Sequence, residues 1–167
     1  MYVDSPPECA AASMNHAPGR VNASNPLFPF ARFDRIHFAR FFIFMETAEH
    51  QFLESLGTSV AIKEDGDRIG WPRVAASCDY LAPARFGDVL DLHVKVARKG
   101  RTSITWEHEI SRGGTPICRG RITSVCCRFG PDGAAQPVPL PRIVADQIEE
   151  APAESPAINR RARSSAP

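Results

Sequence analysis

The stretch FFIFMETAEHQFLESLG, residues 41–57, decides the fold of this chain. Its apolar residues recur at steps of three and four, the spacing that lines one face of an α-helix; they are Phe41, Met45, Ala48, Phe52 and Leu56. Residues 42–44 are apolar as well and lie on other faces, so we expect the first half of the helix to be wrapped by other structure. Gly57 is well placed to end the helix in a left-handed conformation. We therefore predict one long helix, with Glu49 among its solvated residues.

Alternating apolar and polar residues after the helix predict β-strands. The alternating stretches are residues 74–80, 90–96 and 104–110, and a last long strand is predicted at 117–129. Tight turns at Lys99-Gly100 and Gly113-Gly114 imply antiparallel neighbours. With a first strand expected near residues 28–33, the sequence predicts an α+β fold in which a curved antiparallel sheet of about five strands wraps one central helix.

Composition narrows the classes of partner. The 167 residues, 43% hydrophobic and 23% charged, have the profile of one ordinary globular domain. Twenty Lys and Arg against 19 Asp and Glu leave a net charge of +1, which provides no general field for nucleic acid or an anionic membrane. The longest apolar run, residues 41–45, is far shorter than the roughly 20 residues that span a bilayer. We expect neither a nucleic-acid nor a membrane partner.

The five cysteines favour buried thiols over disulfides or a metal site. They include no CxxC pair and no Cys/His cluster with zinc spacing. Adjacent Cys126 and Cys127 are expected to point to opposite faces of one strand. The first twenty residues contain Asp4 and Glu8 and lack the basic start and apolar core of a secretory signal. These features predict a cytoplasmic protein.

The two ends differ in composition from the middle. Residues 1–25 hold prolines and small residues without periodicity and predict a flexible N-terminal arm. Residues 146–167 combine prolines with a short Arg-rich cluster and predict a disordered tail. The folded domain is therefore expected at residues 26–145.

Three stretches resemble the hotdog-fold acyl-CoA thioesterases of the 4-hydroxybenzoyl-CoA thioesterase type. They are IHFARFFIFMETAEH at 36–50, SCDYLAPARFGD at 77–88 and GRTSIT at 100–105. The resemblance covers about residues 30–129 and implies a hotdog fold, with the helix as the sausage and the sheet as the bun. In this family two subunits pair their sheets edge to edge, active sites form at the interface, and dimers often pair into tetramers. The resemblance thus implies an acyl-CoA substrate and a homodimer or homotetramer.

Thioester hydrolysis sets two chemical requirements. A carboxylate must act as general base or nucleophile, and preorganised donors must meet the carbonyl oxygen as negative charge develops on it. A helix N-terminus supplies free N–H groups and a partial positive charge. Here the N-terminus is predicted at Phe38, Ala39 and Arg40, which we expect to bind the substrate.

The loop before the helix departs from the family pattern Asp-x-Asp-x-x-Gly-x-Val. Alignment without a gap places Ala31 where the family has its catalytic Asp, and Asp34 is the one acidic residue between Glu8 and Glu46. Either a shortened loop lets Asp34 serve as the catalytic carboxylate, or that carboxylate is absent. In the second case Asp34 caps the helix or pairs with a neighbouring arginine.

Two further residues complete the predicted catalytic set. His37 lies beside the expected helix N-terminus and is predicted to polarise the carbonyl or relay a proton; the alternative is a structural histidine. Glu46 stands where the family has an acidic residue that often supports the active-site loop; the alternative is an exposed helix carboxylate.

The phosphates of coenzyme A call for cations and donors. The candidates are Arg85, Lys99, Arg101 and Ser103, with Arg128 as a further cation. Trp71 and Tyr80 are expected to line the acyl pocket or to pack in the core, and Asp88 to serve a turn.

The sequence therefore predicts an acyl-CoA thioesterase that needs no metal or added cofactor. A hotdog dehydratase using His37 and Glu46 is less well supported, because the Gly-His-Phe-Pro type motif is incomplete. A non-catalytic acyl-CoA-binding protein is the other alternative, supported by Ala31 at the aligned catalytic position.

Overall fold

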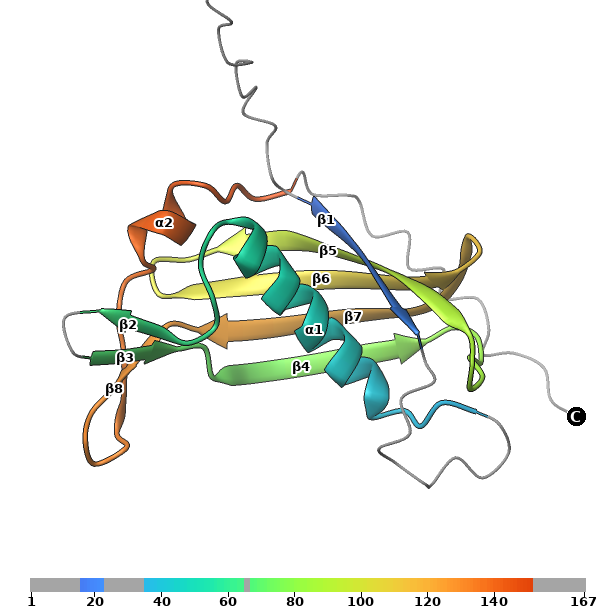
Figure 1. Cartoon of the computed structure of the whole chain (residues 1–167), viewed down its shortest axis with the longest axis horizontal. Helices are drawn as coiled ribbons and strands as arrows, with labels where there is room; N and C mark the ends of the chain where they lie inside the picture. Colours follow the sequence, from blue (N-terminus) through green and yellow to red (C-terminus); the bar gives the residue numbers. More distant parts are fainter. Residues whose placement is uncertain (1–15, 23–34, 65–66, 152–167) are drawn as a thin grey trace, which may run out of the picture.

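The structure is a computed structural model that describes residues 16–22, 35–64 and 67–151. A single long helix lies across one face of a five-stranded antiparallel sheet, and a smaller four-stranded sheet stands at one end (Figure 1). This arrangement confirms the predicted α+β architecture. The strand expected near residues 28–33 and the candidate Asp34 lie outside the described residues.

Helix α1, Arg40–Ser55, matches the predicted helix within one residue at each end. Its apolar stripe is buried, and Gly57 follows it with a φ of 79°, the left-handed conformation that a residue without a Cβ adopts freely. Packing against the sheet centres on Phe52 and Trp106, whose ring centroids lie 5.3 Å apart in an edge-to-face arrangement. In the described ranges, neither helix has the length and apolar character needed to span a membrane.

The main sheet has the strand order β1-β5-β6-β7-β4, and each neighbouring pair is antiparallel. The strands are β1 His16–Asn22, β4 Arg73–Tyr80, β5 Val89–Lys99, β6 Ser103–Arg112 and β7 Thr115–Val125. Alternate residues of β5 are buried against α1, namely Leu90, Leu92, Val94 and Val96. The alternation of apolar and polar residues in the sequence therefore arises because one face of the strand packs on the core and the other faces away from it.

The smaller sheet has the order β2-β3-β8-β9. Its strands are β2 Ile62–Glu64, β3 Asp67–Gly70, β8 Cys127–Phe129 and β9 Ala135–Pro137. The long strand predicted at 117–129 is therefore wrong as one element, because the chain leaves the main sheet at Cys126. There the backbone N–H of Cys126 bonds to Thr102 O at 2.8 Å, and both Cys126 and Cys127 are buried.

Both ends of the folded region reach further than the predicted boundaries. β1 falls within the stretch predicted as a flexible arm and pairs with β5 along its whole length. Its Pro18 and Gly19 resemble loop residues in sequence, but an edge strand tolerates proline. After the short helix α2, Arg142–Ala145, Ile148 is buried and the N–H of Ala151 bonds to Val96 O at 2.8 Å. Residues 146–151 are therefore attached to the main sheet through Ile148 and Ala151, although most of them are exposed.

Candidate functional site

The N-terminal turn of α1 is exposed, and its first backbone N–H groups are paired locally: that of Ala39 with His37 Nδ1, and those of residues 40–42 with the carbonyls of residues 37–39 at 3.0–3.3 Å. No side-chain bond from the N-cap residue Ala39 closes it, and this described turn contains no acidic residue. His37, Phe38 and Ala39 are exposed. The partial positive charge of the helix end therefore faces the outside without a neutralising carboxylate in the turn. Such an end suits a carbonyl oxygen on which negative charge develops.

His37 has a defined tautomer in this turn. Its Nδ1 accepts a hydrogen bond from the backbone N–H of Ala39 at 3.3 Å. An accepting Nδ1 carries no proton, so in the neutral ring the proton lies on Nε2. The ring rests against Phe38, with centroids 4.3 Å apart. His37 thus has a donor available for a ligand at the helix end.

Tyr80 ties the end of β4 to the same turn. Its hydroxyl donates to Phe38 O at 3.1 Å, and its ring meets Phe41 edge to face with centroids 5.5 Å apart. Desolvation and a hydrogen bond with the Cys78 thiol raise the pKa of Tyr80 to about 12. The hydroxyl therefore keeps its proton and remains a donor at neutral pH.

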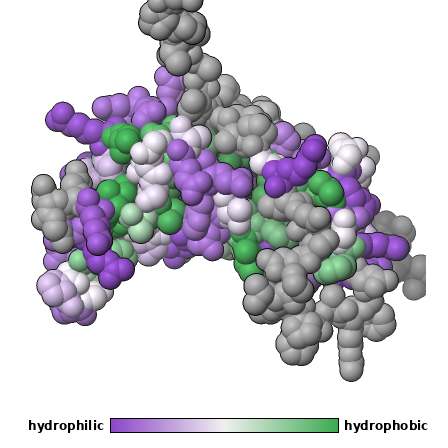
Figure 2. Space-filling view, in the orientation of Figure 1, coloured by the Kyte–Doolittle hydropathy of each residue, from purple (hydrophilic) through white to green (hydrophobic). Residues whose placement is uncertain are grey.

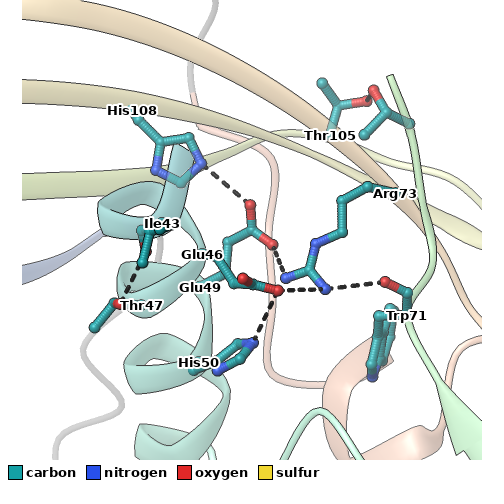
Figure 3. Close-up of polar contacts among 10 residues, drawn as sticks. Ile43, Glu46, Thr47, Glu49, His50, Trp71, Arg73, Thr105 and His108 are labelled. Carbon is teal, nitrogen blue, oxygen red and sulfur yellow. Dashed lines mark hydrogen bonds and ion pairs between the residues drawn. The ribbon is translucent and has the colours of Figure 1, made fainter. Parts of the chain in front are cut away.

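A second polar cluster lies farther along α1 and joins it to β4 and β6 (Figure 3). Arg73 Nη1 is 3.3 Å from Glu46 Oε1, and Arg73 Nη2 is 2.9 Å from Glu49 Oε2. The other oxygen of Glu49 lies 3.3 Å from His108 Nε2. His50 approaches Glu46 at 3.7 Å from the next turn of the helix.

The burial of Glu49 corrects the expectation that it is solvated. Its side chain is 3% exposed, whereas that of Glu46 is 46% exposed. Glu49 lies one turn after Met45, on the stripe that faces the sheet. A charge in that position needs partners, and here Arg73 and His108 provide them. The sequence showed a carboxylate next to the apolar stripe but not the strands that bring these partners to it.

The residues predicted to bind the phosphates do not all lie together. The backbone of Arg85 forms an isolated antiparallel β-bridge with that of Arg35, just before the N-terminal end of α1. Lys99, Arg101 and Ser103 surround the β5–β6 turn. Because β5 has 11 residues at about 3.3 Å each, this turn lies roughly 30 Å from the end of β5 that follows Arg85.

Two of the predicted cations have partners within the chain. Lys99 Nζ donates to the carbonyls of Ala145 and Ile148 at 3.0 and 2.8 Å, so its charge stabilises the end of α2. Arg128 pairs with Asp67 at 3.0 Å across the smaller sheet. Lys99 is therefore engaged by the end of α2, whereas the half-exposed Arg128 stays a predicted phosphate-binding residue. Arg101 is exposed at its turn.

The two aromatic candidates differ in their surroundings. Tyr80 lies at the N-terminal end of α1 and is 47% exposed. Trp71 is buried in the core, and its carbonyl accepts a hydrogen bond from Arg73 at 3.1 Å. Trp71 therefore belongs with the second cluster and not with the helix N-terminus.

A long helix wrapped by an antiparallel sheet in this order is a hotdog fold. Residues 33–119, more than half of the chain, match the sequence profile described as Thioesterase superfamily. The chain belongs to the thioesterase superfamily. No curated protein sequence matches it.

Solved structures show the same fold. A 1,4-dihydroxy-2-naphthoyl-CoA thioesterase from Synechocystis is 22% identical, with a TM-score of 0.65 over 80% of this chain and 95% of that one. A gentisyl-coenzyme A thioesterase is also 22% identical, with a TM-score of 0.62 over 80% and 99%. A hypothetical thioesterase protein from Streptococcus pneumoniae, solved with coenzyme A, is 18% identical, with a TM-score of 0.53 over 67% of this chain and 81% of that one.

Proposed function

We propose that this protein is an acyl-CoA thioesterase that needs no metal or added cofactor. The observation that carries the proposal is the exposed N-terminal turn of α1, with the Nε2–H of His37 beside it, in a chain of the thioesterase superfamily. Structural neighbours named for 1,4-dihydroxy-2-naphthoyl-CoA and gentisyl-CoA favour an aromatic acyl group.

The reaction follows from the charges at this turn. The thioester oxygen lies near the partly positive N-terminal end of α1 and accepts a hydrogen bond from His37. A carboxylate takes a proton from water, and the resulting hydroxide attacks the carbonyl carbon. The negative charge that forms on the oxygen is stabilised by the helix end. When the intermediate collapses, the C–S bond breaks and coenzyme A leaves as a thiolate that takes up a proton.

Two carboxylates are candidates for the base. Asp34 precedes the helix in sequence and lies outside the described residues. Glu46 is seven residues after Ala39, on the same face of α1 and about 10 Å along its axis. Its carboxylate is half-exposed and contacts Arg73 and His50, one turn further along α1, so its use as the base requires a substrate that extends along α1 from the N-terminal turn. Glu49 is less suitable because it is buried and its Oε2 accepts a hydrogen bond from Arg73.

A second copy of the chain completes the site in this proposal. β4 is an edge strand, and its Val74 and Ala76 are exposed. Hydrophobic patches between hydrophilic side chains appear on the face that carries α1 (Figure 2). Antiparallel pairing of β4 with its own copy buries this edge. It also reverses the partner sheet, so that a partner's β5–β6 end comes to the side of the exposed helix turn.

Thiol release from a panel of aromatic, short-chain and long-chain acyl-CoAs tests the proposal. We expect turnover without added metal, and we expect Asp34→Asn or Glu46→Gln to lower kcat by about 100-fold or more, the size of a general-base effect. His37→Ala should cost less than loss of the base. Tight binding of acyl-CoA without thiol release would instead support the non-catalytic binding protein that Ala31 suggests.

A further inference from the structure

The second polar cluster forms a continuous line of alternating charge from the surface to the core. It begins at Glu46, passes through Arg73 and Glu49, and ends at His108 (Figure 3). The exposed fraction of the side chains falls along this line from 46% at Glu46 to 27% at Arg73 and 3% or less at the last two. The exposed Glu46 carboxylate is thereby connected, through Arg73, to side chains that are held in place by burial.

Glu49 and His108 form the fixed end of the line. His108 Nε2 lies 3.3 Å from Glu49 Oε1, at ion-pair distance but without a hydrogen bond between the two atoms. The other oxygen of Glu49 faces Arg73. Both side chains are enclosed by the helix and the sheet. The carboxylate of Glu49 therefore has one orientation.

Arg73 transmits this orientation outward. Nη2 donates to Glu49 at 2.9 Å, and Nη1 donates to the carbonyl of Trp71 at 3.1 Å while lying 3.3 Å from Glu46. Because the guanidinium is planar, fixing two of its contacts fixes the third. A lysine has one nitrogen at the end of a flexible stem and cannot hold both carboxylates in this way.

Stability alone gives a weak reason for such a cluster. Replacing a buried ion pair by apolar residues of similar volume is often neutral or stabilising. An exposed glutamate, in contrast, samples many rotamers unless a partner restrains it. The cluster restrains the Glu46 side chain, and this restraint requires the unfavourable burial of the charged Glu49.

We propose that Arg73 is a positioning residue that holds the Glu46 carboxylate for thioester hydrolysis, with Glu49 and His108 as its buried anchor. The inference rests on the proposed function and adds to it which carboxylate works on the substrate and what orients it. Glu46 contacts the substrate or its attacking water, whereas Arg73, Glu49 and His108 act through Glu46.

A double-mutant cycle on the full chain tests this inference. Glu46→Gln should lower kcat by about 100-fold or more. Arg73→Lys, which keeps the positive charge next to Glu49, should lower kcat by about 10- to 100-fold through misplacement of Glu46, with KM unchanged. Added to Glu46→Gln, Arg73→Lys should cause no further loss. Glu49→Gln should behave as Arg73→Lys does and provides a second route if one variant folds poorly. Arg121→Lys is the matched control, because Arg121 makes a 2.9 Å pair with Glu107 on the outer face of the sheet.

The outcomes separate this inference from the proposed function. If the wild-type protein hydrolyses acyl-CoA and Glu46→Gln is fully active, the inference is wrong while the function stands, and Asp34 becomes the base. If Glu46→Gln is inactive but Arg73→Lys and Glu49→Gln retain wild-type kcat, or lose the same factor in both backgrounds, Arg73 does not position Glu46. If the wild type releases no thiol from any acyl-CoA, the proposed function falls and the inference falls with it.

Discussion

Gly120 of β7 lies directly against the side chain of Met45 on α1, with no room for a side chain between them. A Cβ on Gly120 would overlap the methyl group and sulfur of Met45 and would also lie 3.3 Å from Ser77 O. Met45 is fully buried, so its side chain can move away only by displacing its neighbours in the core. Because Gly120 is the register partner of His108, this close approach also sets how near α1 comes to the strand that carries the imidazole.

We expect Gly120→Ala to lower the free energy of unfolding by about 1–3 kcal/mol, the usual cost of overpacking a core. Urea denaturation followed by circular dichroism would measure it. The double variant Gly120→Ala/Met45→Ala should lose less stability than the sum of the losses of the two single variants, because the shortened side chain at position 45 makes room for the added methyl group. Strict additivity would show that Met45 is not the obstacle.

We expect Glu49→Ala to be among the more destabilising changes in the helix. It leaves Arg73 and His108 without their shared carboxylate, and removing one partner of a buried ion pair costs about 3–5 kcal/mol. Chemical denaturation at pH 7 measures the loss. Glu109→Ala is the control, because Glu109 is exposed and pairs with exposed Arg119 at 3.6 Å, a type of pair worth about 0–1 kcal/mol. If the two variants lost equal amounts of unfolding free energy, burial of Glu49 would not be the reason for its larger predicted effect.

Asp88 gives the protein an acid-dependent component of stability. Its carboxylate accepts the backbone N–H of Arg85 at 2.7 Å and pairs with Arg112, and these contacts, the backbone hydrogen bond first, lower the pKa of Asp88. A pKa that is lower in the folded than in the unfolded state means that the unfolded state binds more protons. The stabilisation is therefore complete above the unfolded pKa of about 3.9 and is lost as the pH falls through the folded value.

Asp88→Asn should accordingly be less stable than the wild type at pH 7, and the difference should shrink as the pH falls below about 4. Thermal unfolding at a series of pH values measures both. Glu109→Gln controls for the loss of one exposed carboxylate. A difference between wild type and Asp88→Asn that stays constant down to pH 2 would contradict the assignment.

We expect the protein to be at least a dimer and to become monomeric when the open edge of β4 is charged. Ala76 is exposed, and its register partner Ile122 is buried, so Ala76 faces the helix side of the sheet beyond the edge of the protomer. Ala76→Arg should reduce the mass in light scattering from two chains to one and abolish turnover. Glu109→Gln, on the outer face, should leave the mass unchanged. A dimer that persists in Ala76→Arg would show that the chains pair elsewhere.

The spacing of apolar residues was sufficient to predict an element wherever that element keeps a single spacing along its whole length. Helix α1 and strands β4, β5 and β6 lie where the steps of three to four and of two predicted them. The stretch 117–129 has no turn residue pair at Cys126, so its division between two sheets could not be predicted from the sequence. The break depends on a hydrogen bond to Thr102 O, a contact distant in sequence. β1 was missed because its pairing comes from β5 and not from its own propensity.

The features of the candidate site also differ in whether they could be predicted from local sequence. The exposed turn at His37–Ala39 could be predicted because a helix end is a local feature. The roles of Glu49 and Lys99 could not, since each depends on partners 24 to 59 residues away: Arg73 and His108 for Glu49, Ala145 and Ile148 for Lys99. Spacing on a helix indicates which residues share a face, but only the fold shows what that face meets.

The two edges of the main sheet are not equivalent. At one edge, β1 contains Pro18, which lacks the N–H that an added strand would need. At the other, β4 contains neither proline nor glycine and can extend the ladder. Pairing of β4 with its own copy leaves β1 at both outer edges of the joined main sheet, where Pro18 removes one N–H that a further strand would use. This pairing therefore favours a closed pair of chains over continued growth of the main sheet.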